Sequence, residues 1–343
     1  MTGLQAPFPW FGGKRTIADL VWDRLGDVSN YVEPFFGSGA VLLARPHEPR
    51  NETVNDLDAY VSNFWRAVRD DPEQVAELMS WPVNECDLEA RHRWLVESVR
   101  KYEHQRRMRE DPDYYDPKIA AYWCWGLCAW IGRGWCGGEW FGSSDENNHG
   151  TGTCNGAVKL PHLGRGQGVH RQLPHLSGAG QGVHRQRPHL SKAGQGVHRK
   201  LPHLGDAGQG ECARRLSVLI DWMQRLSDRL RNVRVCCGDW TRILGPWNVC
   251  LGVTAVFLDP PYSTAAGRDP NVYREEDLTV AVAVREWALA HGDDPMFRIA
   301  LCGYEDEHAM PDSWECLPWK AQGGMGNQRN DTYVNRFRER IWF

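Results

Sequence analysis

The sequence predicts an α/β fold built on a mostly parallel sheet, and three observations support this prediction. Short apolar segments with the character of strands alternate with segments whose apolar residues recur at helical spacing. A glycine-rich turn follows the first of these strands. Acidic residues stand directly after three of the strands, at the edge where parallel sheets bind their ligands.

The predicted elements follow in order along the chain. The N-terminal part predicts a strand with a glycine turn in "SNYVEPFFGSGAVLLA" (29–44), and a strand running into a helix in "RNETVNDLDAYVSNFWRAVR" (50–69). The C-terminal part predicts a helix in "ARRLSVLIDWMQRLSDRLRNV" (213–233) and strands in "RVCCGDW", "TAVFLDPPY" and "FRIALCGY". The acids that fall at strand ends are Asp56, Asp239 and Asp259.

Length and composition limit the class of protein. With 343 residues, 41% of them hydrophobic, the chain can form two domains or one domain with a large insertion. It has no apolar stretch of about 18 residues, and "MTGLQAPFPW" lacks the features of a signal peptide, so we expect a soluble, cytoplasmic protein without a membrane partner. Eleven cysteines spread through apolar runs fit a reducing compartment. The net charge of −4 means that any surface for a polyanion must be local.

A basic internal repeat occupies the middle of the chain. From Lys159 a unit of about 14 residues recurs, as in "LPHLSGAGQGVHRQ" and "RPHLSKAGQGVHRK". The last copy is incomplete and ends at residue 210. No Asp or Glu occurs between Asn155 and Gly205, whereas eight Lys and Arg residues do. The density of glycine and proline excludes a continuous helix. Two interpretations stay open: a solvated insertion, and an arm that contacts phosphates.

The stretch "AAYWCWGLCAWIGRGWCGGEWFG" (120–142) precedes the repeat. Its tryptophans at helical spacing favour a core helix, with a base-stacking platform as the alternative; they are Trp123, Trp125, Trp130 and Trp135. The nearby thiols and imidazole lack the paired CxxC spacing of a structural zinc site, so we expect no metal; they are Cys124, Cys128, Cys136, His149 and Cys154. The histidines of the repeat are interpreted as turn or phosphate-contact residues rather than ligands.

The glycine turn "EPFFGSG" indicates a cofactor. Gly37 and Gly39 remove side chains so that a ligand can approach the backbone, and Asp56 stands at the end of the next strand, where an acid can bind ribose hydroxyls. This pattern favours an adenosine-bearing cofactor. Taken alone, it also fits an NAD enzyme or a turn that binds nothing.

Five motifs taken together make the sequence similar to a known family. "PWFGGKR", "VEPFFGSGAV", "NDLDAYVSNFW", "CGDW" and "DPPY", in that order, resemble the Dam-type DNA adenine-N6 methyltransferases. The resemblance covers residues 7–69 and about 212–343. It implies a Rossmann-like S-adenosylmethionine-dependent methyltransferase sheet formed by residues 1–69 and 212–343. Residues 70–211 would then be an inserted target-recognition domain that includes the repeats of 159–210.

The chemistry of methyl transfer to an amino group explains why four residues stand together directly after a predicted strand: Asp259, Pro260, Pro261 and Tyr262. The adenine amino group is a poor nucleophile, and acceptors that hold both of its hydrogens favour its attack on the sulfonium methyl group. We expect Asp259 and the carbonyl of Pro260 to be these acceptors, fixed in place by the two prolines. Tyr262 would stack on a base that has left the duplex.

The resemblance also assigns the cofactor-binding residues. Lys14 would bind the methionine carboxylate, Asp56 the ribose, and Asp239 the adenine of the cofactor. The full set implied for S-adenosylmethionine is Trp10, Lys14, Phe35, Gly37, Gly39, Asp56, Asp239 and Asp259.

Other classes of protein remain as alternatives. A cytosine-N4 methyltransferase more often carries serine before the Pro-Pro pair, and a protein-glutamine methyltransferase asparagine. A dehydrogenase would need a hydride-transfer site beyond the shared glycine turn, and the repeat alone argues for a catalytically silent DNA-binding protein. The expected partner is double-stranded DNA, bound by a monomer. A cognate nuclease and a restriction-modification role are left open.

Overall fold

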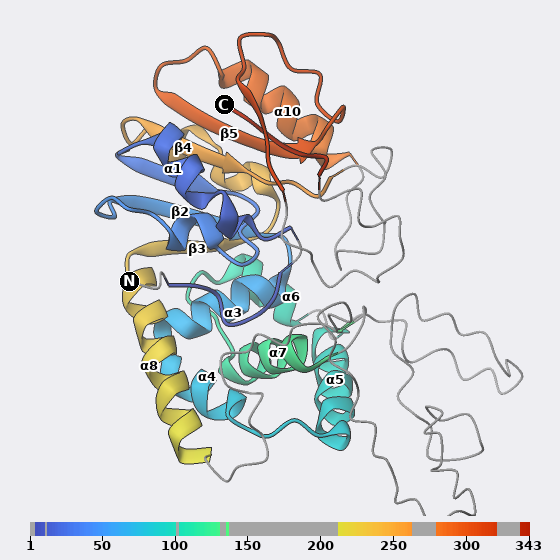
Figure 1. Ribbon diagram of the computed structural model, residues 1–343. Helices are drawn as coiled ribbons and strands as arrows, with labels where there is room; N and C mark the ends of the chain where they lie inside the picture. The colour runs from blue at the N-terminus through green and yellow to red at the C-terminus, as the bar shows by residue number, and fades with distance from the viewer. Residues whose placement is uncertain are drawn as a thin grey trace, which may run out of the picture.

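The computed structural model describes residues 4–10, 12–100, 103–130, 135–136, 212–262, 279–320 and 337–343. Within them the strands form one seven-stranded sheet in the order β3-β2-β1-β4-β5-β7-β6 (Figure 1). This architecture confirms the predicted α/β class and the Rossmann-like methyltransferase sheet. The basic repeat, His149 and Cys154 lie outside the described residues.

The five predicted strands are all present and pair with one another in parallel. They are β1 (Asn30–Glu33), β2 (Asn51–Asp56), β3 (Val233–Cys237), β4 (Thr254–Leu258) and β5 (Phe297–Tyr304). Two further strands, which the sequence did not indicate, extend the sheet in antiparallel fashion: β7 (Glu339–Trp342) pairs with β5, and β6 (Cys316–Pro318) pairs with β7.

The strand order reverses between β1 and β4. The chain moves outward from β1 to β2 and β3, and then returns to place β4 on the other side of β1. In the register of the sheet, Val32 of β1 lies between Thr53 of β2 and Val256 of β4. Such a reversal opens a crevice beyond the carboxyl ends of the two strands, and ligands of open α/β sheets bind there. Asp56 ends β2 and Asp259 directly follows β4 at this edge.

Helices connect the strands and cover the sheet. The helices of the two predicted catalytic segments are η1 (Lys14–Thr16), α1 (Ala18–Leu25), α2 (Ala40–Leu43), α3 (Ala59–Asp70), α8 (Cys212–Leu230), η4 (Trp240–Ile243), α9 (Pro246–Val249) and α10 (Val280–His291). Those of the predicted insertion are α4 (Pro72–Met79), α5 (Glu85–Arg100), α6 (Glu103–Glu110) and α7 (Pro117–Ala129). The carboxylates of Asp58 and Asp116 accept hydrogen bonds from first-turn amides of α3 and α7 and so fix where these helices begin.

Alternating residues of each strand supply two separate cores. Phe257 and Cys302 face the larger core, which also holds apolar side chains of α1, α3, α4, α7 and α8. Val256 and Leu301 face the smaller core, which α10 covers. Because side chains alternate across a strand, the sheet is buried on both faces.

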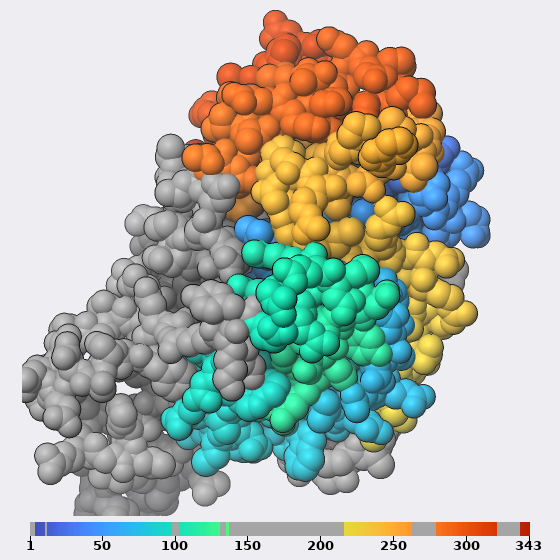
Figure 2. Space-filling model, turned by 180° about the vertical axis from the view of Figure 1, so that it is seen from behind, coloured from blue at the N-terminus to red at the C-terminus, as the bar shows by residue number. Residues whose placement is uncertain are grey.

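The helices α4 to α7 form a lower body that packs against α3 and α8 (Figures 1 and 2). Trp123, Trp125 and Trp130 are buried there, and the indole of Trp125 donates to the carbonyl of Trp81 at 2.9 Å. The interpretation of these tryptophans as core residues is therefore confirmed. The division of the chain at residues 70 and 211 stays a prediction. None of the helices that the structure describes is long and apolar enough to cross a membrane.

Candidate active site

The glycine loop between β1 and α2 forms one wall of the crevice. Gly37 and Gly39 have φ values of 46° and 61°, which residues other than glycine rarely adopt. A Cβ at Gly37 would collide with the indole of Trp10, so the ring lies directly on the loop backbone. The amide of Gly37 donates to Oδ2 of Asp56 at 2.9 Å. Glycine is therefore required for this tight turn, and Asp56 holds the turn at the end of β2.

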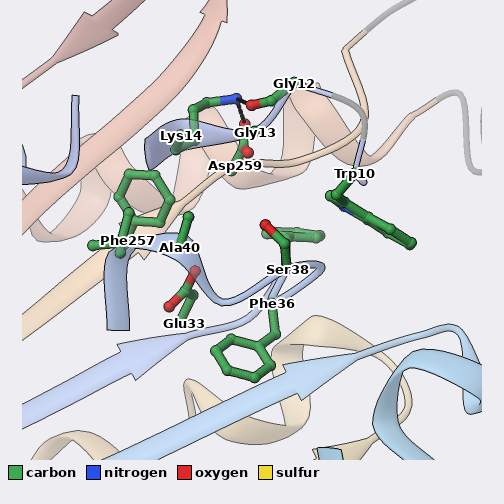
Figure 3. A pocket seen from close by; sticks show the side chains of 12 residues that line it. Trp10, Gly12, Gly13, Lys14, Glu33, Phe36, Ser38, Ala40, Phe257 and Asp259 are labelled. Atoms are coloured by element: carbon green, nitrogen blue, oxygen red, sulfur yellow. Dashed lines mark hydrogen bonds and ion pairs between the residues drawn. The ribbon is translucent and has the colours of Figure 1, made fainter. Parts of the chain in front are cut away.

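A pocket opens between this loop and the start of η1. Its lining includes Trp10, Lys14, Glu33, Phe35 and Asp259 (Figure 3). Four of these five are predicted site residues, and they come from three separate parts of the chain. The topological reversal, the glycine loop and the pocket thus coincide, which is the usual arrangement for a ligand site in an open α/β sheet.

Lys14 and Asp259 form a buried ion pair inside this pocket. The Nζ atom of Lys14 lies 2.8 Å from Oδ1 of Asp259 and donates to the carbonyl of Gly12 at 2.9 Å (Figure 3). The Lys14 side chain is only 5% exposed. Burial acts to lower the pKa of Lys14, but the negative charges of Asp259 and Glu339 outweigh it and raise the pKa above its ordinary value. The site therefore holds a permanent ammonium group beside the acid of the "DPPY" motif.

The contacts of Asp259 leave one side of its carboxylate for a ligand. The hydroxyl of Tyr262 lies 3.4 Å from Oδ1, the same oxygen that Lys14 contacts. Oδ2 takes no hydrogen bond from the residues that the structure describes. Asp259 is 21% exposed, at the edge of the sheet. An amino group entering the crevice would find Oδ2 as an acceptor.

The other predicted site residues differ in how far they are buried. Pro260 is buried, Pro261 is half-buried, and the two carry the chain from Asp259 to the buried Tyr262. Asp56 is half-exposed and adjoins the pocket through its hydrogen bond to the loop. Asp239 is exposed beyond β3 and caps η4, where its carboxylate accepts from the amide of Thr241 at 3.0 Å. Asp239 does not line the pocket; its neighbour Trp240 contacts the pocket residue Phe35, with ring centroids 6.2 Å apart.

The sequence did not indicate two acidic residues of the site. Glu33 ends β1, lines the pocket, and accepts a hydrogen bond from the hydroxyl of Tyr31 at 2.8 Å. Burial raises its pKa well above the ordinary value. Glu339 of β7 is buried and accepts from the hydroxyl of Tyr262 at 2.7 Å. An acid inside a buried strand before the glycine turn was a usable signal for Glu33, whereas Glu339 stands between two arginines and looks like part of an exposed charged segment.

The sheet and its crevice define the class as a Rossmann-like methyltransferase fold, and a family comparison gives the particular group. Residues 10–119 match the family model described as D12 class N6 adenine-specific DNA methyltransferase. This range contains Trp10, Lys14, the glycine loop and Asp56, and the match confirms the resemblance to DNA adenine methyltransferases.

Two curated relatives agree with the family model. Over 72 residues the chain is 32% identical to the Type II methyltransferase M1.LlaDCHI of Lactococcus lactis subsp. cremoris, covering 21% of this chain and 25% of the relative. Over 79 residues it is 29% identical to the Type II methyltransferase M.MjaIII of Methanocaldococcus jannaschii, covering 21% and 27%. The matches thus span about a quarter of the length of these relatives.

Proposed function

We propose that this protein transfers a methyl group from S-adenosylmethionine to N6 of adenine in double-stranded DNA. The observation that carries the proposal is the carboxylate of Asp259 at the reversal point of the sheet, with Oδ1 paired to Lys14 and Oδ2 facing no described donor. A paired carboxylate at this position is a fixed hydrogen-bond acceptor, which is what an exocyclic amino group requires.

The lining of the pocket suits S-adenosylmethionine in charge and in aromatic character. The buried ammonium of Lys14 suits a carboxylate such as that of the methionine part. Trp10 and Phe35 offer aromatic faces, and the glycine loop lets a ligand approach its backbone. The half-exposed carboxylate of Asp56 lies at the end of β2, where ribose hydroxyls are bound in related folds. Bound there, the cofactor supplies a methyl group on a positively charged sulfur.

The chain's own residues prepare the amino group for attack. Oδ2 of Asp259 accepts one hydrogen of the amino group, and the carbonyl of Pro260 accepts the other. Both hydrogens are then held out of the ring plane. The lone pair of the amino nitrogen is therefore localised on that atom instead of being delocalised into the ring. Because Pro260 and Pro261 fix the backbone, these acceptors need no rearrangement when the base arrives. The base must leave the duplex to reach them, and Tyr262 contacts its face.

The finer assignments belong to the same proposal. The family model favours adenine over cytosine as the acceptor, and the intact acceptor corner argues against a silent DNA-binding protein. We infer that the protein acts as a monomer on DNA and in the cytoplasm. A partner nuclease would fit the Type II relatives, whose names describe methyltransferases only.

Expression in a host that lacks DNA methylation tests the proposal. Sequencing of plasmid DNA for modified bases should show N6-methyladenine within one short sequence, and Asp259→Ala should abolish the signal. Binding of S-adenosylmethionine by the wild-type protein is measured separately by calorimetry. Plasmid DNA without modified bases, despite cofactor binding, would contradict the proposed substrate. N4-methylcytosine in its place would show the alternative acceptor.

A further inference from the structure

Glu339 lies beside the acceptor corner, which we define as residues 259–262, although it is 77 residues away from Tyr262 along the chain. Its Oε2 atom accepts the hydroxyl hydrogen of Tyr262 at 2.7 Å. Only 4% of its surface is exposed, so the carboxyl group is almost completely removed from water. A buried carboxyl group is costly unless it has hydrogen-bond partners, which makes an accidental placement here unfavourable.

The neighbouring strand completes the setting of Tyr262. Tyr304 of β5 stands directly opposite Glu339 of β7 in the antiparallel register. Side chains at opposed positions point to the same face of a sheet, so both reach Tyr262. The rings of Tyr304 and Tyr262 are 4.6 Å apart and inclined by 68°, an edge-to-face contact. One cross-strand pair therefore holds Tyr262 at its hydroxyl group and at its ring.

We propose that Glu339 is a positioning residue for methyl transfer, which fixes the hydroxyl group of Tyr262 and so holds the Tyr262 ring beside Asp259. The inference rests on the proposed function, because the ring is expected to contact the target base. Glu339 does not touch the acceptor carboxylate in this arrangement; it acts through Tyr262, whose hydroxyl lies 2.7 Å from Glu339 and 3.4 Å from Asp259.

A second effect of Glu339 must be separated from this one. Its negative charge also acts on the buried ammonium of Lys14 and contributes to the raised pKa of that group. Glu339→Gln removes the charge but keeps an oxygen that accepts from Tyr262. Glu339→Ala removes both. Tyr262→Phe removes the hydroxyl group and leaves the charge of Glu339 in place.

The test compares these three variants in single-turnover methyl transfer and in steady-state kinetics, on DNA that carries the site identified by sequencing. Glu339→Ala should lower kcat/KM for DNA by about 10- to 100-fold, the range expected when a buried hydroxyl group loses its acceptor. Glu339→Gln should restore most of this loss. The affinity for S-adenosylmethionine, measured by calorimetry, should change less than about threefold in Glu339→Gln. In the Tyr262→Phe background, Glu339→Ala should cause much less further loss than it causes in the wild type.

The control is Glu305→Gln, at the end of the same β5-β7 ladder. Glu305 is 51% exposed and pairs with Arg340 at 2.8 Å instead of reaching Tyr262, so this variant should match the wild type. Equal losses in Glu339→Gln and Glu339→Ala would overturn the proposal, because the charge rather than the hydrogen bond would then matter. If Glu339→Ala does not fold, Glu339→Gln and Tyr262→Phe decide: a loss of kcat/KM in Glu339→Gln as large as that in Tyr262→Phe overturns the proposal. A wild-type protein that methylates no DNA would instead refute the proposed function.

Discussion

Removal of Asp259 should destabilise the fold as well as stop methyl transfer. Asp259 is the ion-pair partner of Lys14, whose side chain is 5% exposed and whose other contact is the carbonyl of Gly12. Breaking a buried pair from one side typically costs 3 to 5 kcal/mol, because the remaining charge stays buried without its partner. Asp259 is itself 21% exposed, so we expect Asp259→Ala to lower the free energy of unfolding by about 3 kcal/mol.

Urea denaturation of four proteins measures this coupling: the wild type, Asp259→Ala, Lys14→Met and the double variant. Because each single change removes the same interaction, the double variant should lose about 2 kcal/mol less than the two losses added together. A matched control is the pair of Arg24 and Glu315, which has the same 2.8 Å separation but is 41% and 48% exposed. Glu315→Ala should cost less than about 1 kcal/mol. Additive effects at Lys14 and Asp259, within about 0.5 kcal/mol, would refute the reasoning.

Three further predictions follow from the structure and the sequence. Gly37→Ala should abolish binding of S-adenosylmethionine in calorimetry, because a Cβ there collides with the indole of Trp10 at a φ of 46°; unchanged affinity would contradict the assigned loop. Burial raises the pKa of Glu339 from 4.5 to about 7, so the folded protein binds this proton more tightly and its stability falls as the pH rises between these values. Relative to Glu339→Gln, the wild type should lose about 3 kcal/mol of unfolding free energy from pH 4 to pH 8, and a constant difference would contradict the shift. The groups facing Glu339 are the same in both proteins: Lys14, Asp259, Tyr262, Cys302, Tyr304 and Glu307. Deletion of residues 166–193 should flatten the salt dependence of DNA affinity without changing the methylated sequence, since each lost phosphate contact removes about 0.9 from the logarithmic slope; an unchanged slope would make the repeat a passive insertion.

The sequence predicted the parallel half of the sheet because each of its strands is an apolar run with a clear end. The run "AVFL" stops at Asp259, and β4 ends at Leu258. The antiparallel strands β6 and β7 gave no such signal. They contain three and four residues, and each includes charged or proline side chains. Their pairing is determined by the edge of β5, which is a tertiary contact and has no local pattern in the sequence.

The sequence identified most residues of the candidate site, but it did not indicate which of them contact one another. The motifs assigned Lys14 to the cofactor and Asp259 to the target base, so nothing in the sequence indicated that the two form an ion pair. Their contact arises because η1 lies over the reversal point between β1 and β4. Glu339 was missed for a related reason. Acids beside other charged residues are usually solvated, and the burial of Glu339 follows only from the β5-β7 ladder.

The environment of each acid explains why Asp259, and no other acid of the crevice, suits the acceptor role. Burial raises the pKa of Glu33 well above its ordinary value, and burial raises that of Glu339 to about 7. A protonated carboxyl group donates from one oxygen and is therefore a poorer acceptor for an amino group. Asp259 instead pairs with the ammonium of Lys14 at 2.8 Å through Oδ1 and keeps Oδ2 without a donor among the described residues. Of the three carboxyl groups, the one in an ion pair is thus also the most exposed, so an entering amino group can reach it.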